Sequence, residues 1–228
     1  MNLIEVENLR VRYGAFEAVR GVSFTLGKGE ILGIVGESGS GKSTIAKTLI
    51  GLEKPFSGRI AIGAKSMQMV FQDAVGSLNP KLKVGSALAE VVKVAKSRRT
   101  PGELLEMVGL SPAVLDQYPR ELSGGQCQRV SVARALACTP EVLIADEPVS
   151  ALDVSVQARI LNLLRQLRRE LGLSILLIAH DLAVVKNVCD DIAVMEKGVF
   201  VDQGSADEVF ANPQSAYTRK LLSAVPTI

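Results

Sequence analysis

The chain has 228 residues, of which 47% are hydrophobic and 22% charged, and its formal net charge is +2. This composition predicts an ordinary globular protein with a sizeable core, and the nearly balanced charge argues against a nucleic-acid binder. No apolar run approaches the roughly 18 residues of a membrane-spanning helix, and the first ten residues lack the apolar core of a signal peptide. We therefore expect any work at a membrane to pass through a partner.

The first half of the chain predicts strands followed by helices. Alternating or continuous apolar residues indicate strands at 3–11, 18–26, 30–35, 58–62 and 67–71. Residues 84–110 then have helical periodicity, interrupted by Thr100-Pro101-Gly102.

The second half predicts strands that alternate with helices. Helices are indicated at 125–137, 155–171 and 182–188, and in the tail from 205 with a break at Pro213. Buried strands are indicated at 142–145 and 174–179, and a hairpin at 192–202. This alternation predicts an α/β fold with a parallel sheet, and the N-terminal strands predict an added antiparallel layer.

Residues 36–44 read GESGSGKST and follow the apolar run at 30–35. A glycine-rich loop alone is usually a turn, but Lys-Ser-Thr at this spacing, between a strand and a helix, predicts a nucleoside triphosphate site. The glycines let backbone N–H groups converge on phosphate oxygens, and the helix N-terminus adds its positive dipole end. The predicted nucleotide-binding residues of this loop are Gly36, Glu37, Ser38, Gly39, Ser40, Gly41, Lys42, Ser43 and Thr44.

Two side chains of this loop have specific expected roles. Lys42 can reach the β- and γ-phosphates, and the Ser43 hydroxyl can ligate Mg²⁺. We expect Lys42 to be solvent-accessible in the empty site.

The strand at 142–145 ends in two carboxylates, Asp146 and Glu147. In a chain that also has a phosphate loop, Asp146 is expected to hold the coordination shell of Mg²⁺, and Glu147 is expected to polarise the attacking water. Taken alone, the pair would be read as solvated acids at the end of a strand.

Residues 122–126 read LSGGQ. Ser123 has the character of a helix N-cap, and Gly124-Gly125 leaves backbone N–H groups open to an anion, although an ordinary capped helix would look the same. Together with the phosphate loop, Asp146-Glu147 and His180, in this order, LSGGQ resembles the ATPase subunit of an ABC transporter over essentially the whole chain. The resemblance implies nucleotide contacts by Ser123, Gly124, Gly125 and Gln126, with ATP and Mg²⁺ as cofactors.

Four further positions match the family one at a time. Tyr13 resembles the aromatic residue that stacks on adenine, although it could simply end a strand. Gln72, in MVFQD, resembles the glutamine that touches Mg²⁺ and faces the membrane subunits. Asp153, in SALD, resembles the residue that communicates across a dimer. His180, in IAHD, resembles the catalytic switch histidine, although a lone histidine is usually structural.

The resemblance implies an α/β fold with a P-loop NTPase core, a mainly parallel sheet, an N-terminal antiparallel β layer and a small helical subdomain. Residues 1–228 would form a single ABC ATPase domain, with the helical subdomain inserted at about 78–137. In the family, two such subunits pack head to tail around ATP. The second subunit could be the same chain or a paralogue.

Two segments resemble the branch that imports oligopeptides, dipeptides and nickel. They are FQDAVGSLNP at 71–80 and YTRKLLSAVP at 217–226. The implied partners are two membrane permease subunits and, indirectly, an extracytoplasmic substrate-binding protein, with the chain peripheral on the cytoplasmic face of the membrane. Peptides and nickel or other metal chelates both remain open as cargo.

Departures from the family pattern are few. Ala145 is smaller than the residue usual before the acidic pair, the segment between 62 and 67 is short, and Cys127 follows LSGGQ. A reactive Cys127 thiol is one interpretation, and an inert buried thiol is the one we expect. Because Cys127, Cys138 and Cys189 match neither a disulfide framework nor a zinc motif, we also expect a reducing compartment.

Two rival classes share the phosphate loop. A non-transport ABC ATPase, as in DNA repair, carries a long coiled coil between the loop and LSGGQ, whereas this chain has a short insert there. A P-loop kinase or GTPase has no role for LSGGQ, and no guanine-specific N-K-x-D occurs. The non-transport ABC ATPase is kept as the alternative to the transport ATPase.

Overall fold

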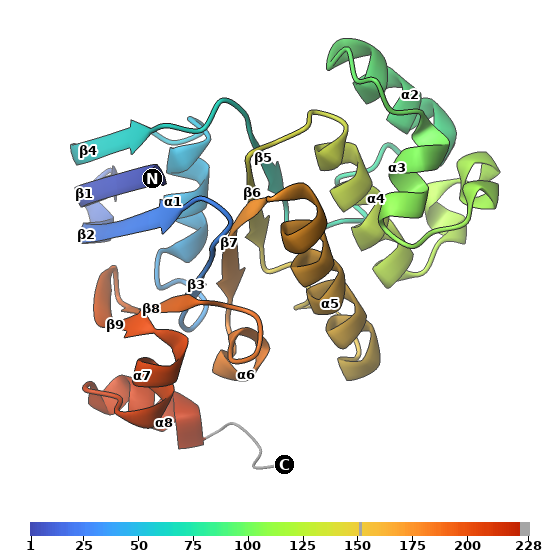
Figure 1. Cartoon of the computed structure of the whole chain (residues 1–228). Helices are drawn as coiled ribbons and strands as arrows, with labels where there is room; N and C mark the ends of the chain where they lie inside the picture. The colour runs from blue at the N-terminus through green and yellow to red at the C-terminus, as the bar shows by residue number, and fades with distance from the viewer. Residues whose placement is uncertain (151, 224–228) are drawn as a thin grey trace.

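The computed structural model describes residues 1–150 and 152–223. The strands form two sheets, of which the larger runs through the middle of the molecule and the smaller lies at its side (Figure 1). The smaller sheet has the order β2-β1-β4 and is antiparallel, which confirms the predicted N-terminal layer. Its strands are β1 (Asn2–Tyr13), β2 (Phe16–Gly27) and β4 (Ser57–Ile62).

The larger sheet has the order β5-β6-β7-β3-β8-β9, and only the last pair is antiparallel. Its strands are β3 (Ile31–Val35), β5 (Met67–Val70), β6 (Val142–Asp146), β7 (Ser174–Ala179), β8 (Asp191–Glu196) and β9 (Val199–Ser205). Every residue of β3, β6 and β7 is buried, as expected for parallel strands covered on both faces. The carboxyl ends of these three neighbours meet at one edge of the sheet.

The core is divided by this sheet into two clusters. Leu32 and Ile34 of β3 pack into the cluster shared with the antiparallel sheet and α1 (Lys42–Leu49). Ile31 and Val35 point to the opposite face, into the cluster formed with the remaining helices. This alternation follows from the two-residue period of a strand. Both faces of β3 are therefore anchored, and the loop that follows β3 starts from a rigid base.

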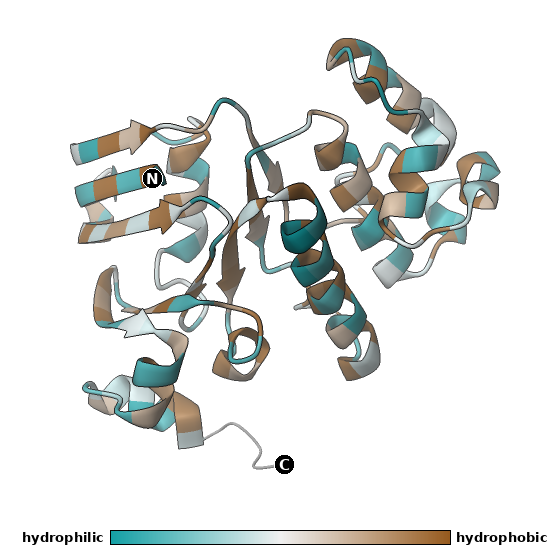
Figure 2. Ribbon diagram, viewed as in Figure 1, coloured by the Kyte–Doolittle hydropathy of each residue, from teal (hydrophilic) through white to brown (hydrophobic). Residues whose placement is uncertain are grey.

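Helices cover the second face of the large sheet. They include α5 (Val154–Leu171), α6 (Leu182–Val185), α7 (Ala206–Ala211) and α8 (Ala216–Ser223). Helix α5 buries one apolar stripe and turns its charged face outward, as Figure 2 shows by colour. Helix α6 ends at Val185, three residues before the end predicted from periodicity, and the tail has the predicted break near Pro213.

Between β5 and β6 the chain carries helices only, and they lie at one end of the molecule (Figure 1). These are α2 (Val84–Val94), α3 (Pro101–Met107), η1 (Pro112–Asp116), η2 (Pro119–Glu121) and α4 (Gly124–Leu136). Helix α2 ends earlier than the periodicity indicated, and Lys96 has a positive φ of 49°. Thr100 then begins α3 with a capping box that includes Glu103.

Among the described residues, no helix combines the length and the apolar character needed to cross a membrane.

Candidate active site

The phosphate loop joins β3 to α1, as the sequence predicted. Two of its glycines face backbone at close range. A Cβ on Gly36 would collide with the carbonyl oxygen of Met195, and one on Gly41 with that of Ala18. Gly41 also has a φ of 110°, which side-chain-bearing residues rarely adopt. The loop therefore needs glycine at these positions to lie against its neighbours.

The loop offers donors that fit phosphate oxygens. The hydroxyl of Ser40 is buried and has no hydrogen-bond partner among the described residues, which is rare for a buried polar atom. The loop also ends at the N-terminus of α1, whose first turn contains no acidic residue. An orphaned hydroxyl at a positive helix end is an arrangement suited to an anion.

Lys42 is buried, which corrects the expectation that it is solvent-accessible. Its side chain is only 3% exposed. Its Nζ donates to the carbonyl oxygens of Gly36 at 2.7 Å and Glu37 at 3.0 Å, and it lies 3.8 Å from Oε1 of Glu147. These oxygens replace water around the ammonium group, so the side chain folds under the loop. Burial lowers the pKa of Lys42, while the carboxylates of Glu147 and Asp146 oppose this change.

Asp146 ends β6 beside the start of α1. Its Oδ1 accepts a hydrogen bond of 2.9 Å from the Ser43 hydroxyl. Burial raises the pKa of Asp146, and the Ser43 bond partly reverses this shift. A hydroxyl and a carboxylate are the hard oxygen donors that Mg²⁺ prefers. The described residues contain no cluster of three His, Cys, Asp or Glu side chains, so further ligands would have to come from other oxygens.

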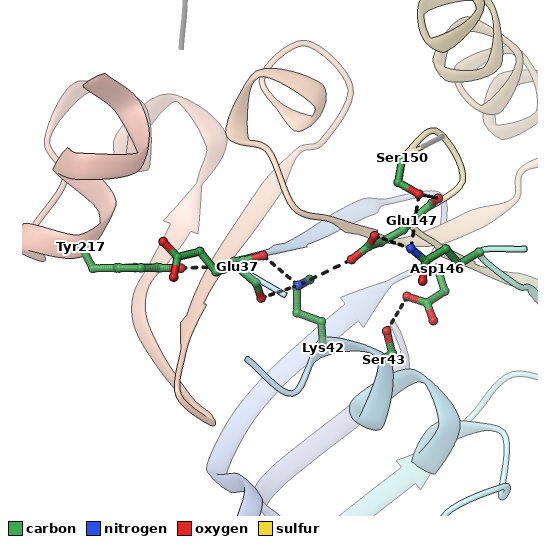
Figure 3. A network of polar contacts seen from close by, with 9 residues as sticks. Glu37, Lys42, Ser43, Asp146, Glu147, Ser150 and Tyr217 are labelled. Carbon is green, nitrogen blue, oxygen red and sulfur yellow. Dashed lines mark hydrogen bonds and ion pairs between the residues drawn. The ribbon is translucent and has the colours of Figure 1, made fainter. Parts of the chain in front are cut away.

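The Glu147 carboxylate approaches Lys42 with one oxygen, as Figure 3 shows, and accepts a hydrogen bond from Gln72 with the other. Its Oε2 accepts from Nε2 of Gln72 at 2.9 Å, and the same amide lies 3.4 Å from the Ser150 hydroxyl. Glu147 has a φ of 45°, the left-handed region that costs a non-glycine residue about 1–3 kcal/mol. Its backbone N–H donates to Ile178 on β7 at 3.0 Å. Backbone strain of this kind is concentrated at functional sites, and here it directs a carboxylate toward the phosphate loop.

His180 and Tyr13 lie outside this network. His180 directly follows β7 and is exposed at the same edge of the sheet as Asp146. Tyr13 ends β1 and is 43% exposed. Burial raises the pKa of Tyr13, with smaller effects from the neighbouring side chains of Thr44 and Glu53. Tyr13 therefore lies beside the last residue of the loop motif.

The LSGGQ segment begins α4. The Ser123 hydroxyl accepts from the Gln126 N–H at 3.3 Å, and Oε1 of Gln126 accepts from the Ser123 N–H at 2.8 Å. This capping box confirms the predicted N-cap. Asp153 caps α5 through a 2.9 Å bond from the Val156 N–H, and its pKa is lowered by bonds from Ser155 and Val156.

The two caps adjoin each other. A Cβ on Gly125 would collide with the Val156 side chain, and one on Gly124 would press on Leu152. No hydrogen bond or ion pair between described residues joins either cap to the phosphate loop of its own chain. Gly124 does border a groove of about 310 Å³ that Gln72 and Glu147 also line.

The thiol of Cys127 is fully buried, with a 3.6 Å contact to the carbonyl oxygen of Pro119. Burial raises the pKa of Cys127, which disfavours the reactive thiolate. The expectation that this thiol is buried is confirmed, and its inertness stays a prediction.

Sequence reasoning missed two contacts at this site. Ser150 bonds Gln72, and the Tyr217 hydroxyl accepts from the backbone N–H of Glu37 at 2.9 Å. Tyr217 belongs to the segment at 217–226, whose resemblance to a branch of the family gives no sign of this contact. Positions 224–226 of that segment, and Ala151 within SALD, lie outside the described residues.

Comparison with known proteins identifies relatives of the whole chain. The sequence pattern of the family described as ABC transporter matches residues 19–150. The chain is 44% identical to the oligopeptide transport ATP-binding protein OppF of Escherichia coli over 98% of this chain and 78% of that protein.

Solved structures with the same fold extend the comparison. The structure of cbiO1 from Clostridium perfringens, part of the ABC transporter complex cbiONQ, superposes with a TM-score of 0.81 at 31% identity, covering 99% of this chain and 96% of that one. The ATP-binding cassette MJ0796, described as dimeric in a post-hydrolysis state with ADP and Pi, superposes with a TM-score of 0.76 at 29% identity, covering 89% of this chain and 98% of that one.

Proposed function

Because the chain belongs to the ABC transporter family, we propose that it is the ATP-binding and ATP-hydrolysing subunit of an importer of oligopeptides. The observation that carries this proposal is the convergence of Lys42, Ser43, Asp146 and Glu147 beside a glycine loop whose buried Ser40 hydroxyl has no partner among the described residues. We interpret residues 1–228 as one ATPase domain with the helical subdomain at about 78–137.

ATP binding is assigned to the loop and its neighbours. The backbone N–H groups of residues 36–44 and the Lys42 ammonium hold the phosphates, and the ring of Tyr13 stacks on the base. Lys42 is held by two loop carbonyls, so it needs only to exchange these partners for phosphate oxygens.

Mg²⁺ is assigned to Ser43, Asp146 and Gln72. When bound, the ion neutralises charge on the phosphate oxygens. The Ser43 hydroxyl and Asp146 carboxylate already lie within 2.9 Å of each other. The amide of Gln72 instead donates to Glu147, so its oxygen is free of that bond and its nitrogen orients the carboxylate.

Hydrolysis is assigned to Glu147 and His180. Glu147 accepts a proton from the attacking water, and His180 contacts the γ-phosphate from the next strand of the sheet. Lys42 and Gln72 hold the Glu147 carboxylate from two sides.

The LSGGQ residues and Asp153 serve the site of a second ATPase subunit. Ser123 and Asp153 each accept a hydrogen bond from the first turn of the helix that they cap. Neither has a bond to the phosphate loop of its own chain within the described residues. A second subunit packed head to tail would bring Ser123, Gly124, Gly125 and Gln126 over ATP held by the first. The dimeric state described for MJ0796 supports this arrangement, and in a homodimer the two sites would be equivalent.

Membrane permeases are the proposed partners, with the ATPase peripheral on the cytoplasmic face and a substrate-binding protein on the other side. Oligopeptides are proposed as cargo because relatives such as OppF, 44% identical, are named for their transport. Nickel or other metal chelates are the competing cargo.

Reconstitution in vesicles tests both the ATPase function and the oligopeptide cargo. The chain, purified with its co-expressed permeases in vesicles, should hydrolyse ATP and accumulate a labelled oligopeptide only when the substrate-binding protein is present. Uptake of nickel in place of peptide would overturn the cargo assignment. Failure of the chain to bind ATP would overturn the function itself.

A further inference from the structure

The C-terminal helix α8 contacts the phosphate loop from behind, although about 180 residues separate them in sequence. Tyr217 of α8 reaches the loop with its hydroxyl, which accepts the backbone N–H of Glu37 at 2.9 Å. In Figure 3, Tyr217 lies on the far side of Glu37 from Lys42, so the ring supports the loop without facing the reacting groups.

Helix α8 is itself anchored to β9 by Asp202. The Asp202 carboxylate accepts from the N–H groups of Gln214 and Ser215, each at 2.9 Å, and from the hydroxyl of Thr218. Thr218 is fully buried. Hydrogen bonds to a charged acceptor are stronger than neutral ones. Tyr217 therefore projects from a helix whose first turn is tied to the sheet.

The peptide groups of Glu37 are held on both sides. Its N–H donates to Tyr217, and its carbonyl oxygen accepts from Lys42 at 3.0 Å. A second contact supports the loop nearby, where the N–H of Gly198 in the β8–β9 turn donates to the carbonyl oxygen of Ser40 at 2.9 Å. A shift of Glu37 would therefore move the carbonyl that holds the Lys42 ammonium.

The charged contact between the same elements is weak by comparison. Nζ of Lys220 lies 3.7 Å from Oε1 of Glu37, with side chains 75% and 61% exposed. Exposed ion pairs contribute little to stability. The Tyr217 hydroxyl, whose ring packs against the core, is the stronger link between α8 and the loop.

We propose that Tyr217 is a positioning residue for ATP. Its hydroxyl holds the phosphate loop through the Glu37 N–H and so fixes the position of the Lys42 ammonium group. The proposal rests on the proposed nucleotide-binding function. It assigns to α8 a direct influence on nucleotide affinity, so a partner that moved this helix would change the occupancy of the site.

The test replaces Tyr217 by Phe in the full chain, which keeps the ring and removes the acceptor. A net hydrogen bond corresponds to about 2- to 10-fold in an equilibrium constant. We expect the Kd for a fluorescent ATP analogue and the KM for ATP to rise about 2- to 10-fold, with kcat changed by less than about twofold. Tyr118→Phe, the same change at the residue just before η2 in the helical region, is the matched control and should alter neither constant.

A nucleotide-free measurement tests the contact directly. Hydrogen–deuterium exchange at the Glu37 amide should accelerate in Tyr217→Phe, while exchange in the central strands β3 and β7 stays unchanged. Lys220→Ala should leave both this exchange and the Kd for the ATP analogue near their original values, because the exposed ion pair contributes little.

The outcomes separate the inference from the function on which it rests. If the unmodified chain binds the ATP analogue and Tyr217→Phe binds it equally well, the positioning role is overturned and the function stands. If the unmodified chain binds no nucleotide, the proposed function fails, and the positioning role with it. A uniform rise in exchange across the sheet, with kcat falling as much as affinity, would show that Tyr217 is only structural.

Discussion

Lys42 is the residue on which the geometry of the site depends. Its ammonium group is shared by two loop carbonyls and lies near the Glu147 carboxylate, while its aliphatic stem is buried under the loop. Packing and charge therefore act through the same side chain, and truncating Lys42 to a small residue removes both at once.

Comparing two variants at this position separates the two effects. Lys42→Met keeps the stem and removes the charge, so nucleotide affinity should fall about 10- to 100-fold, the effect of losing a charge-assisted hydrogen bond. Lys42→Ala should lose affinity equally and should also be less stable than Lys42→Met by about 2–5 kcal/mol, because it leaves a cavity. Titration with a fluorescent ATP analogue and urea unfolding measure these quantities. Unchanged affinity and turnover in both variants would refute the phosphate-loop assignment.

Glu147→Gln should bind ATP and barely hydrolyse it. The amide keeps the shape and the contact with Gln72, but it cannot accept the proton of the attacking water. We expect kcat to fall roughly 10²- to 10⁴-fold, with ATP-bound dimer accumulating on a sizing column. Glu141→Gln is the control: it makes the same change at the residue that precedes the first residue of β6, and it should keep normal turnover. Near-normal phosphate release from Glu147→Gln would remove this residue from the catalytic role.

At the scale of elements, helix α8 depends on one carboxylate. Burial alone would raise the pKa of Asp202, but the hydrogen bonds from Thr218, Ser215 and Gln214 outweigh it and lower the pKa below its usual value. Because the folded pKa is the lower one, the stabilisation is complete at neutral pH. This stabilisation begins to be lost when the pH falls below about 3.9, the pKa of an aspartate in the unfolded chain. The loss continues as the pH falls through the lower pKa of the folded state.

Asp202→Asn should therefore destabilise the protein in a pH-dependent way. At pH 7 the free energy of unfolding should fall by about 1–3 kcal/mol, because a charged acceptor is replaced by a neutral one. The difference from the unmodified chain should shrink toward pH 3, as measured by urea unfolding at both pH values. Asp207→Asn, a change at an exposed aspartate in α7, is the control. A difference that grows on acidification would contradict the assigned direction of the pKa shift.

At the scale of the whole molecule, the LSGGQ cap and the phosphate loop of one chain are not bonded to each other within the described residues. The proposed head-to-tail pair therefore makes each ATP site from two chains. A Lys42→Ala chain and a Ser123→Arg chain should each be inactive alone. In a mixed dimer, the intact loop of the Ser123→Arg chain faces the intact LSGGQ of the other chain.

Mixing the two inactive proteins should thus restore part of the ATPase activity, once light scattering with ATP has confirmed that they dimerise. The expected yield is at most one working site in each mixed dimer. Full activity of the Ser123→Arg chain by itself would rule out a site shared between chains.

Much of the architecture was predictable because its determinants are local. Strand β3, the glycine-rich loop and helix α1 follow one another directly in the sequence. All three could therefore be predicted from one short segment. The capping box at Ser123 and Gln126 is equally local. The end of α2 at Val94 was not predicted, because no Gly or Pro follows it until Pro101.

Residue type and spacing were enough to select the residues to which we assign the chemistry, namely the phosphate loop, Asp146 and Glu147. How these residues are held follows from the folded structure. Burial of Lys42 depends on carbonyl groups whose direction is set by the folded loop, and the contact of Tyr217 with Glu37 joins residues from nearly opposite ends of the chain. Such contacts leave no local pattern, because they arise only when the sheet brings distant segments together.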